Sequence, residues 1–244
     1  MIRLLQNYYF GDGPGVPKDA PKPKGLRLLL SIFRREWWDL LRLNLLCIAF
    51  SLPLVTVPAA WFATVSVCTA MIEDRNVYLW RDFWQAFRAR FAVTTGLGLA
   101  LSAAVALCYF AIRTYAEGAT DNLLVAAPLT VSITCSVFLP VYGAHVFAGL
   151  AKGAGRTLPD ILKAAALGLL IRPLPGLLAL AVVALLWLAH IAFYPTSVLL
   201  PVLVNFSVGA LVMTLAVLRG VEFGLSHVVP NRPQEAGTPE GSST

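Results

Sequence analysis

The chain has 244 residues, of which 58% are hydrophobic and only 13% are charged, and its formal net charge is +6. Soluble domains carry roughly 25% charged residues, so this composition excludes an ordinary soluble domain and indicates a membrane protein with one domain. The basic residues lie beside long apolar runs, so we expect them to meet the lipid bilayer and its anionic headgroups, and we expect no nucleic acid partner.

The two ends of the chain differ from the middle. Residues 1–25 are rich in Pro, Gly and Lys, and we expect a flexible cytoplasmic segment without a signal peptide. Residues 230–244 contain too few apolar side chains to bury a core, so we expect a disordered cytoplasmic tail. Residues 26–229 are then the helical membrane domain.

Four runs without Lys, Arg, Asp or Glu mark the expected membrane spans: residues 43–72, 91–112, 122–151 and 173–218. A helix needs roughly 20 apolar residues to cross a bilayer. The second run therefore predicts one crossing, and the third, with Pro128 and Pro140 near its ends, predicts one long or kinked helix. The fourth must hold two helices, separated at Tyr194-Pro195-Thr196.

The first run leaves two arrangements open, because residues 43–72 are many for one crossing and few for two. A single kinked helix would divide Lys and Arg almost evenly between the two sides of the membrane. A hairpin that enters and returns places 18 of the 19 Lys and Arg residues on one side, with only Arg113 opposite. Because cytoplasmic loops concentrate Lys and Arg, we predict the hairpin, with both termini cytoplasmic. It gives about six membrane helices, the first pair short or re-entrant; five spans are the alternative.

The middle of this run predicts a tight turn. Pro53 would end the first helix, Thr56 would cap the N-terminus of the next, and Pro58 would fall in its first turn, where a missing N–H costs nothing. Asn44 lies in the ascending helix, and an amide in a membrane needs hydrogen-bond partners. We expect these to be carbonyls near Pro53 or on a neighbouring helix, with contact to a solute as the alternative.

Basic amphipathic segments, residues 26–42, 77–90 and 158–172, precede the paired crossings. In the second, aromatic residues recur at steps of three or four and line one helical face: Trp80, Phe83, Trp84, Phe87 and Phe91. This face predicts either a lipid anchor or an interface with a partner protein. The pattern as a whole predicts an all-α fold of three units, each an interfacial helix followed by a membrane hairpin.

Catalytic and metal-binding patterns are weak. The expected spans contain no Asp or Glu, which argues against an aspartyl protease or a proton-coupled carrier. Neither HExxH nor GxSxG occurs. The four Cys residues lack zinc-site spacing, and we expect His145 to be a packing residue. The prediction is a protein that is not an enzyme and has no cofactor and no bound metal.

Short segments resemble the YesL-like family of bacterial membrane proteins. They are Leu43-Asn44-Leu45-Leu46, Ser51-Leu52-Pro53-Leu54-Val55-Thr56, the small residues Ala59, Ala60 and Ala63, Asp82-Phe83-Trp84-Gln85-Ala86-Phe87, and a Pro/Gly/Lys stretch at residues 13–22. Cys47 and Val57 depart from the family, which often has an aromatic residue and a glycine at these positions. The resemblance implies the bacterial cytoplasmic (inner) membrane. It implies no activity, but family members are often encoded beside ABC-type carbohydrate uptake systems.

Two classes of function follow. In the first, the chain is a non-catalytic accessory to ABC-type carbohydrate uptake or utilisation and contacts permease subunits. In the second, it is itself a channel or facilitator for a small neutral solute, which amides, hydroxyls and aromatic rings would bind. The lack of acidic residues within the spans disfavours an ion-driven carrier under either reading.

Overall fold

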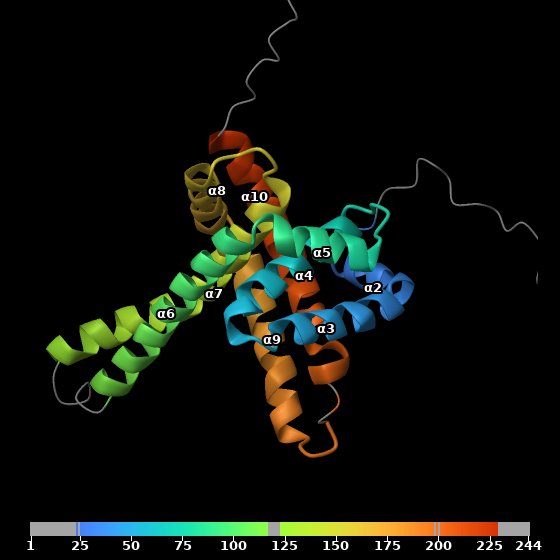
Figure 1. Ribbon diagram of the computed structural model, residues 1–244. Helices are drawn as coiled ribbons and strands as arrows, with labels where there is room; N and C mark the ends of the chain where they lie inside the picture. Colours follow the sequence, from blue (N-terminus) through green and yellow to red (C-terminus); the bar gives the residue numbers. More distant parts are fainter. Residues whose placement is uncertain (1–22, 24, 117–122, 198, 200, 229–244) are drawn as a thin grey trace, which may run out of the picture.

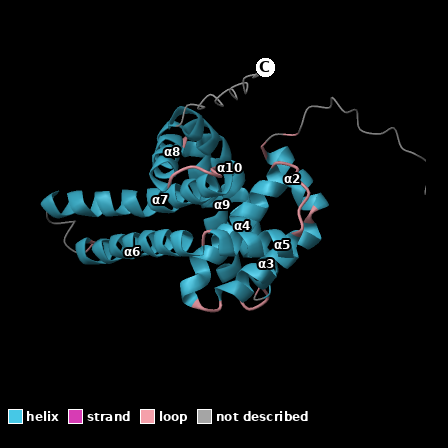
Figure 2. Cartoon of the chain, turned by 45° about the horizontal axis from the view of Figure 1, so that its top comes forward, coloured by secondary structure: helices cyan, strands magenta, loops and turns pink. Residues whose placement is uncertain are grey.

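The computed structural model describes residues 23, 25–116, 123–197, 199 and 201–228. Within them the chain is all-helical, with no strand (Figures 1 and 2). Almost all of the predicted N-terminal segment and the predicted tail lie outside the described residues. The helices, in chain order, are α2 (Leu26–Arg35), α3 (Trp37–Ser51), the 3₁₀ turn η1 (Leu54–Thr56), α4 (Val57–Ile72), α5 (Leu79–Ala89), α6 (Phe91–Tyr115), α7 (Leu123–Lys152), α8 (Leu158–Ile171), α9 (Pro173–Ala192), the π-helical turn η2 (Pro201–Asn205) and α10 (Phe206–Val228).

The predicted order of three units is confirmed. A shorter helix, α2, α5 or α8, precedes each of the hairpins α3–α4, α6–α7 and α9–α10. α7 is one long helix with Pro128 and Pro140 inside it, as expected. One boundary was wrong: α2 ends at Arg35, so Arg42, predicted in the first interfacial segment, belongs to the first helix of the hairpin.

Residues 43–72 fold as a hairpin and not as a single kinked helix. α3 has 15 residues and α4 has 16, with η1 between them. Arg35 precedes the hairpin and Asp74 follows it, and their side chains form an ion pair, with Nη1 2.8 Å from Oδ1. The two flanks therefore meet at the same end of the protein. At 1.5 Å per residue, α3 is about 22 Å long, short of a full crossing.

α4 and α10 form the centre of the protein. α10 packs against α2, α3, α4, α7, α8 and α9, and its contact with α8 is so close that a Cβ on Gly224 would lie 2.1 Å from the Ala164 carbonyl oxygen. In Figure 1 the α6–α7 pair runs to the lower left, whereas α9 runs downward, so the two arms diverge. Within its most apolar stretch, 67% of α4 is buried in the protein, compared with 17% of α6 and 11% of α9.

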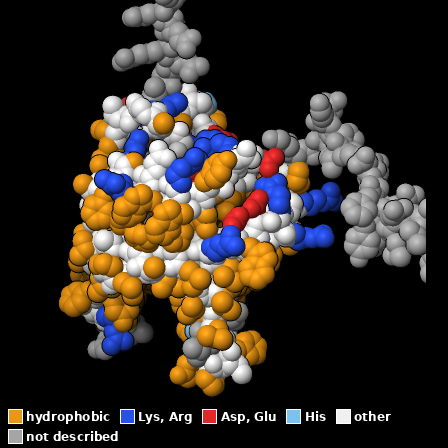
Figure 3. All heavy atoms as spheres, turned by 45° about the vertical axis from the view of Figure 1, so that its right-hand side comes forward, with side chains coloured by type: hydrophobic (Ala, Val, Ile, Leu, Met, Phe, Trp, Pro, Cys, Tyr) orange, Lys and Arg blue, Asp and Glu red, His pale blue; other side chains and the backbone are white. Residues whose placement is uncertain are grey.

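Charged side chains join the ends of three helices. The Lys152 ammonium at the end of α7 donates to Glu73, just after α4, and to Glu222 of α10 at 2.8 Å. Arg156 donates to the Leu225 carbonyl oxygen at 2.6 Å. We call this region the charged end. Figure 3 shows Lys and Arg gathered over the upper part of the visible face, with the projecting arms largely hydrophobic.

Five of the described helical segments are long and apolar enough to cross a membrane: Leu54–Ile72, Phe91–Tyr115, Leu124–Lys152, Pro173–Ala192 and Pro201–Val228. They indicate a multi-pass membrane protein. α3, with 15 residues, is shorter than these segments and is not among them.

The hairpin makes a topological prediction. Because Arg35 and Asp74 meet at the charged end, a green fluorescent protein fused after Asp74 should fluoresce in the cytoplasm, as should one fused after Thr244. A fusion of alkaline phosphatase after Tyr115 should be active in the periplasm. Phosphatase activity after Asp74 would contradict the hairpin.

Candidate functional site

Asn44 joins the first hairpin to the last. Its Nδ2 donates to the carbonyl oxygens of Pro201 (3.0 Å) and Val202 (2.6 Å). Its Oδ1 accepts from the backbone amides of Phe206 (2.9 Å) and Ser207 (3.0 Å). The residue is completely buried. The partners lie on a neighbouring helix, which is one of the expected places, and not near Pro53.

The four bonds explain how the chain tolerates a π-helical turn. A π-helix pairs a carbonyl with the amide five residues later, and Pro201 with Phe206, and Val202 with Ser207, have this spacing. The Asn44 carboxamide therefore bridges the groups that a π-turn joins. Both of its N–H donors and two lone pairs of its oxygen are engaged, which supports a structural role over contact with a solute.

We expect Asn44→Leu to destabilise the protein by about 2 kcal/mol, since hydrogen bonds between membrane helices contribute roughly 0.6 kcal/mol each on average. Thermal unfolding in detergent measures the change. Asn205→Leu is the matched control: Asn205 is also buried, but its Nδ2 has no partner among the described residues. Removing an unpaired buried amide should cost little, so an equal loss in the two variants would contradict the role of Asn44.

Thr56 has a different role from the predicted one. It precedes α4, but its side chain makes no cap hydrogen bond to that helix. Instead its hydroxyl donates to the Phe50 carbonyl oxygen at 2.5 Å and lies 2.6 Å from the Pro53 carbonyl oxygen. Thr56 therefore occupies the predicted N-cap position, but the predicted cap hydrogen bond is absent. The end of α3 leaves carbonyls without partners, and the Thr56 hydroxyl satisfies that of Phe50.

Replacing Thr56 by the isosteric Val should leave the Phe50 carbonyl unpaired and lower stability by about 1 kcal/mol. Thr56→Ser keeps the hydroxyl and should unfold close to the parent temperature. The two melting temperatures, compared in the same detergent, measure the hydroxyl directly. Coincident melting of the Val and Ser variants would show that the hydroxyl contributes nothing.

Pro53 and Pro58, the other residues of the predicted turn, lie on either side of η1. Pro53 has an extended backbone and separates α3 from η1. Pro58 lies in the first turn of α4, as predicted, and is buried. It packs directly on α6, because a Cβ on Gly98 would come within 2.2 Å of the Pro58 Cβ.

The aromatic face of α5 points partly into the protein. Phe83 is fully buried and Phe87 almost so, and both pack on the ring of Phe50 from α3, at centroid distances of 5.3 and 5.1 Å. These two residues are core, so they do not contribute to an outward interface. Trp80 and Trp84 are 62% and 39% exposed. Together with Phe91, which is 36% exposed, they are the part of the predicted face that remains accessible.

A large apolar groove lies between the two arms. Its volume is about 690 Å³, and its walls come from α4, α6, α7, α9 and α10. Hydroxyl groups on these walls come from Ser102, Tyr109 and Thr214. An adjoining apolar cavity of about 620 Å³ beside η1 shares Val57 and Trp61 with it. We call the larger space the inter-arm groove. The sequence did not predict it, because its existence depends on how far the two arms diverge.

His145 lies in the packed interior. It is fully buried, and its Nδ1 lies 2.9 Å from the Val141 carbonyl oxygen, to which an Nδ1–H can donate. Cβ atoms on Gly176 and Gly220 would come within 3.7 and 3.1 Å of its ring. Across the described residues, no three His, Cys, Asp or Glu side chains come together in a way that could hold a metal ion.

These features are those of a multi-pass helical membrane protein whose first hairpin is hydrogen-bonded to the last and whose two arms enclose an apolar groove. A family model described as "Protein of unknown function, DUF624" matches residues 40–112. The match covers most of α3, all of α4 and α5, and α6 as far as Ile112, and it includes Asn44, Thr56 and the aromatic face of α5. No curated protein and no solved structure matches the chain.

Proposed function

We propose that this chain is a YesL-like protein of the bacterial cytoplasmic membrane and a non-catalytic accessory to ABC-type carbohydrate uptake or utilisation. The inter-arm groove is the observation that carries the proposal. In this view it holds a transmembrane helix of a permease subunit.

The lining of the groove suits a helix. Small residues from three helices face it: Gly98 and Ala106 of α6, Gly143 and Ala144 of α7, and Gly209 of α10, with Pro58 of α4 beside them. In lipid, helices associate by close packing, and small residues allow their backbones to approach. The weak burial of α6 and α9 leaves apolar surface on both sides for such a partner.

The groove offers less support for a facilitator of neutral solutes. A sugar loses its hydration on entering a membrane, so its hydroxyls need hydrogen-bond partners along the path. Three hydroxyls and the indole of Trp61 stand among mostly aliphatic and small side chains. This surface matches a helix or an acyl chain better than a sugar.

The residues matched by the family model also support a scaffold. Asn44 and Thr56 satisfy backbone groups, and Phe83 and Phe87 fill the core on Phe50. These contacts hold the first hairpin and α5 in place. A non-catalytic role accounts for these residues without any reaction.

Filling the groove should release the partner. Ala106 lines the groove, whereas Ala100 lies on α6, is exposed and does not line it. We expect Ala106→Leu to reduce the amount of ABC permease that co-purifies with the tagged protein, because the larger side chain blocks helix packing. Ala100→Leu should retain the permease.

Two different results would contradict the proposal, one for the groove and one for the accessory role. Equal retention by the two variants would show that the groove does not hold the permease. Sugar flux into liposomes containing this chain alone would instead establish the facilitator and remove the accessory role.

A further inference from the structure

A second, polar cavity lies at the charged end, apart from the inter-arm groove. Its volume is about 510 Å³. α4 forms one wall, the polar side of α5 another, and the end of α7 a third. Its polar lining residues are Ser66, Arg75, Asn76, Arg81, Asp82, Gln85 and Arg90.

The three arginines keep free donors. Arg75 and Arg81 each use only Nε toward a carboxylate, Glu73 at 2.8 Å and Asp82 at 3.0 Å. Their terminal nitrogens have no hydrogen-bond partner within the described part of the chain. Nη2 of Arg90 lies 3.5 Å from the Gly153 carbonyl oxygen, a long contact. A guanidinium carries five N–H donors in a planar fork, so each of these arginines can still bind an anion.

The neutral groups of the cavity also lack partners. The Oγ of Ser66 is buried, and nothing among the described residues hydrogen-bonds to it. A buried hydroxyl left unpaired is unfavourable, but this oxygen does not reach the cavity surface, so it is not counted among the ligand-binding groups. Asn76 and Gln85 add amides, which both donate and accept. Groups of this kind suit hydroxyls of a ligand.

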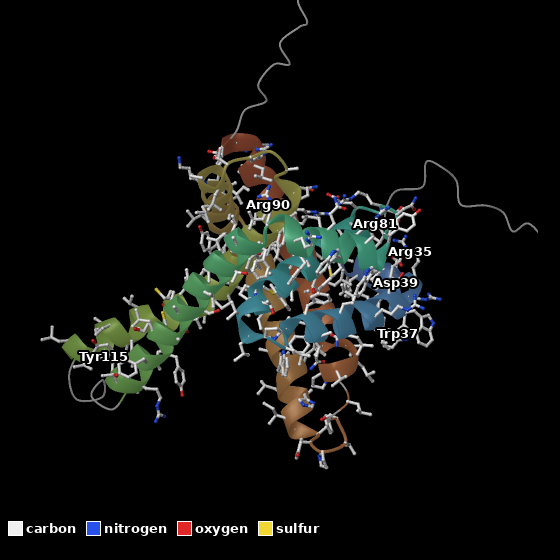
Figure 4. All side chains as sticks on the ribbon, in the orientation of Figure 1. Arg35, Trp37, Asp39, Arg81, Arg90 and Tyr115 are labelled. Carbon is white, nitrogen blue, oxygen red and sulfur yellow. The ribbon has the colours of Figure 1, made fainter. Side chains whose placement is uncertain are left out.

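The spacing of the charges limits the ligand. Arg81 and Arg90 lie toward opposite ends of α5 (Figure 4), about 14 Å apart along the helix at 1.5 Å per residue. The cavity beside α5 is therefore longer than a single phosphate group. A volume of 510 Å³ falls within the usual range for small-molecule sites, and arginine forks match phosphate oxygens in bidentate fashion.

We propose that this cavity binds a phosphorylated polyol, with its phosphate on one of the arginines and its hydroxyls on Gln85 and Asn76. A soluble sugar phosphate and the headgroup of phosphatidylglycerol share this chemistry. Binding does not require a permease, so the purified chain tests it independently of the accessory role.

The experiment uses the full chain in phosphatidylcholine nanodiscs and titrates glucose 6-phosphate, inorganic phosphate and glucose by calorimetry. We expect saturable binding of glucose 6-phosphate that is tighter than that of either fragment. The double variant Arg81→Gln/Arg90→Gln should weaken it by about tenfold or more, which corresponds to about 1.4 kcal/mol. Gln85→Ala should weaken the binding of glucose 6-phosphate and leave the binding of inorganic phosphate unchanged.

Arg88→Gln is the matched control, since Arg88 is also on α5, is exposed and does not line the cavity. Its guanidinium lies over the Trp84 ring at 5.6 Å. This variant should bind like the parent. Nanodiscs containing phosphatidylglycerol identify the source of the ligand. If the lipid competes with glucose 6-phosphate, and this competition is lost in the double variant, the site binds the lipid headgroup. If the lipid does not compete, the site binds the soluble ligand.

Two results would overturn the proposal. One is the lack of saturable glucose 6-phosphate binding in phosphatidylcholine nanodiscs, combined with phosphatidylglycerol retention that is the same in the parent and the double variant. The other is a loss on Arg88→Gln as large as that of the double variant, which would mean that only net charge attracts the ligand.

Discussion

The four hydrogen bonds of Asn44 are the constraint on which the arrangement of the hairpins depends. Inside a bilayer water cannot satisfy a broken helix, so every freed carbonyl and amide needs a partner from the protein. Asn44 supplies these partners to η2 and the start of α10 from a position about 160 residues earlier in the chain. α3 therefore has to lie against α10, and α4, which returns from α3, is held in the centre. The remaining helices pack around α4 and α10.

The same constraint accounts for the turn of the first hairpin. Leu52, Leu54 and Val55 are 78%, 83% and 60% exposed, and the turn carries no charge. Such a surface fits the boundary of the hydrocarbon region better than water, provided that the turn's carbonyls are satisfied. Thr56 meets this need for Phe50 through its hydroxyl and for Pro53 through its backbone N–H. α3 is short, the tip is apolar, and an ion pair joins the two flanks, so the hairpin enters and returns from the same end of the protein.

Sequence reasoning reached the features that depend on local composition. Charge gaps located the helices, and the distribution of Lys and Arg selected the hairpin. It could not foresee η2, because residues 201–205 look like any apolar helix until Asn44 is placed beside them. For Thr56 the residue was right and the helix wrong, since a hydroxyl in a tight turn can reach groups on either side. For α5, periodicity gave the aromatic face, but only the position of Phe50 decides that Phe83 and Phe87 are inside.

The inter-arm groove and the polar cavity share two walls. α4 presents Pro58, Trp61 and Val65 to the groove and Phe62, Ser66 and Ala70 to the cavity, and α7 also lines both. The rings of Phe62, on the cavity side, and Phe147, on the groove side, lie 6.4 Å apart. Coupling between two sites requires an element whose position both ligands change. If both sites are filled as proposed, α4 and α7 are the walls that they share, so a ligand in the cavity would affect a helix in the groove only to the extent that it moves α4 against α7.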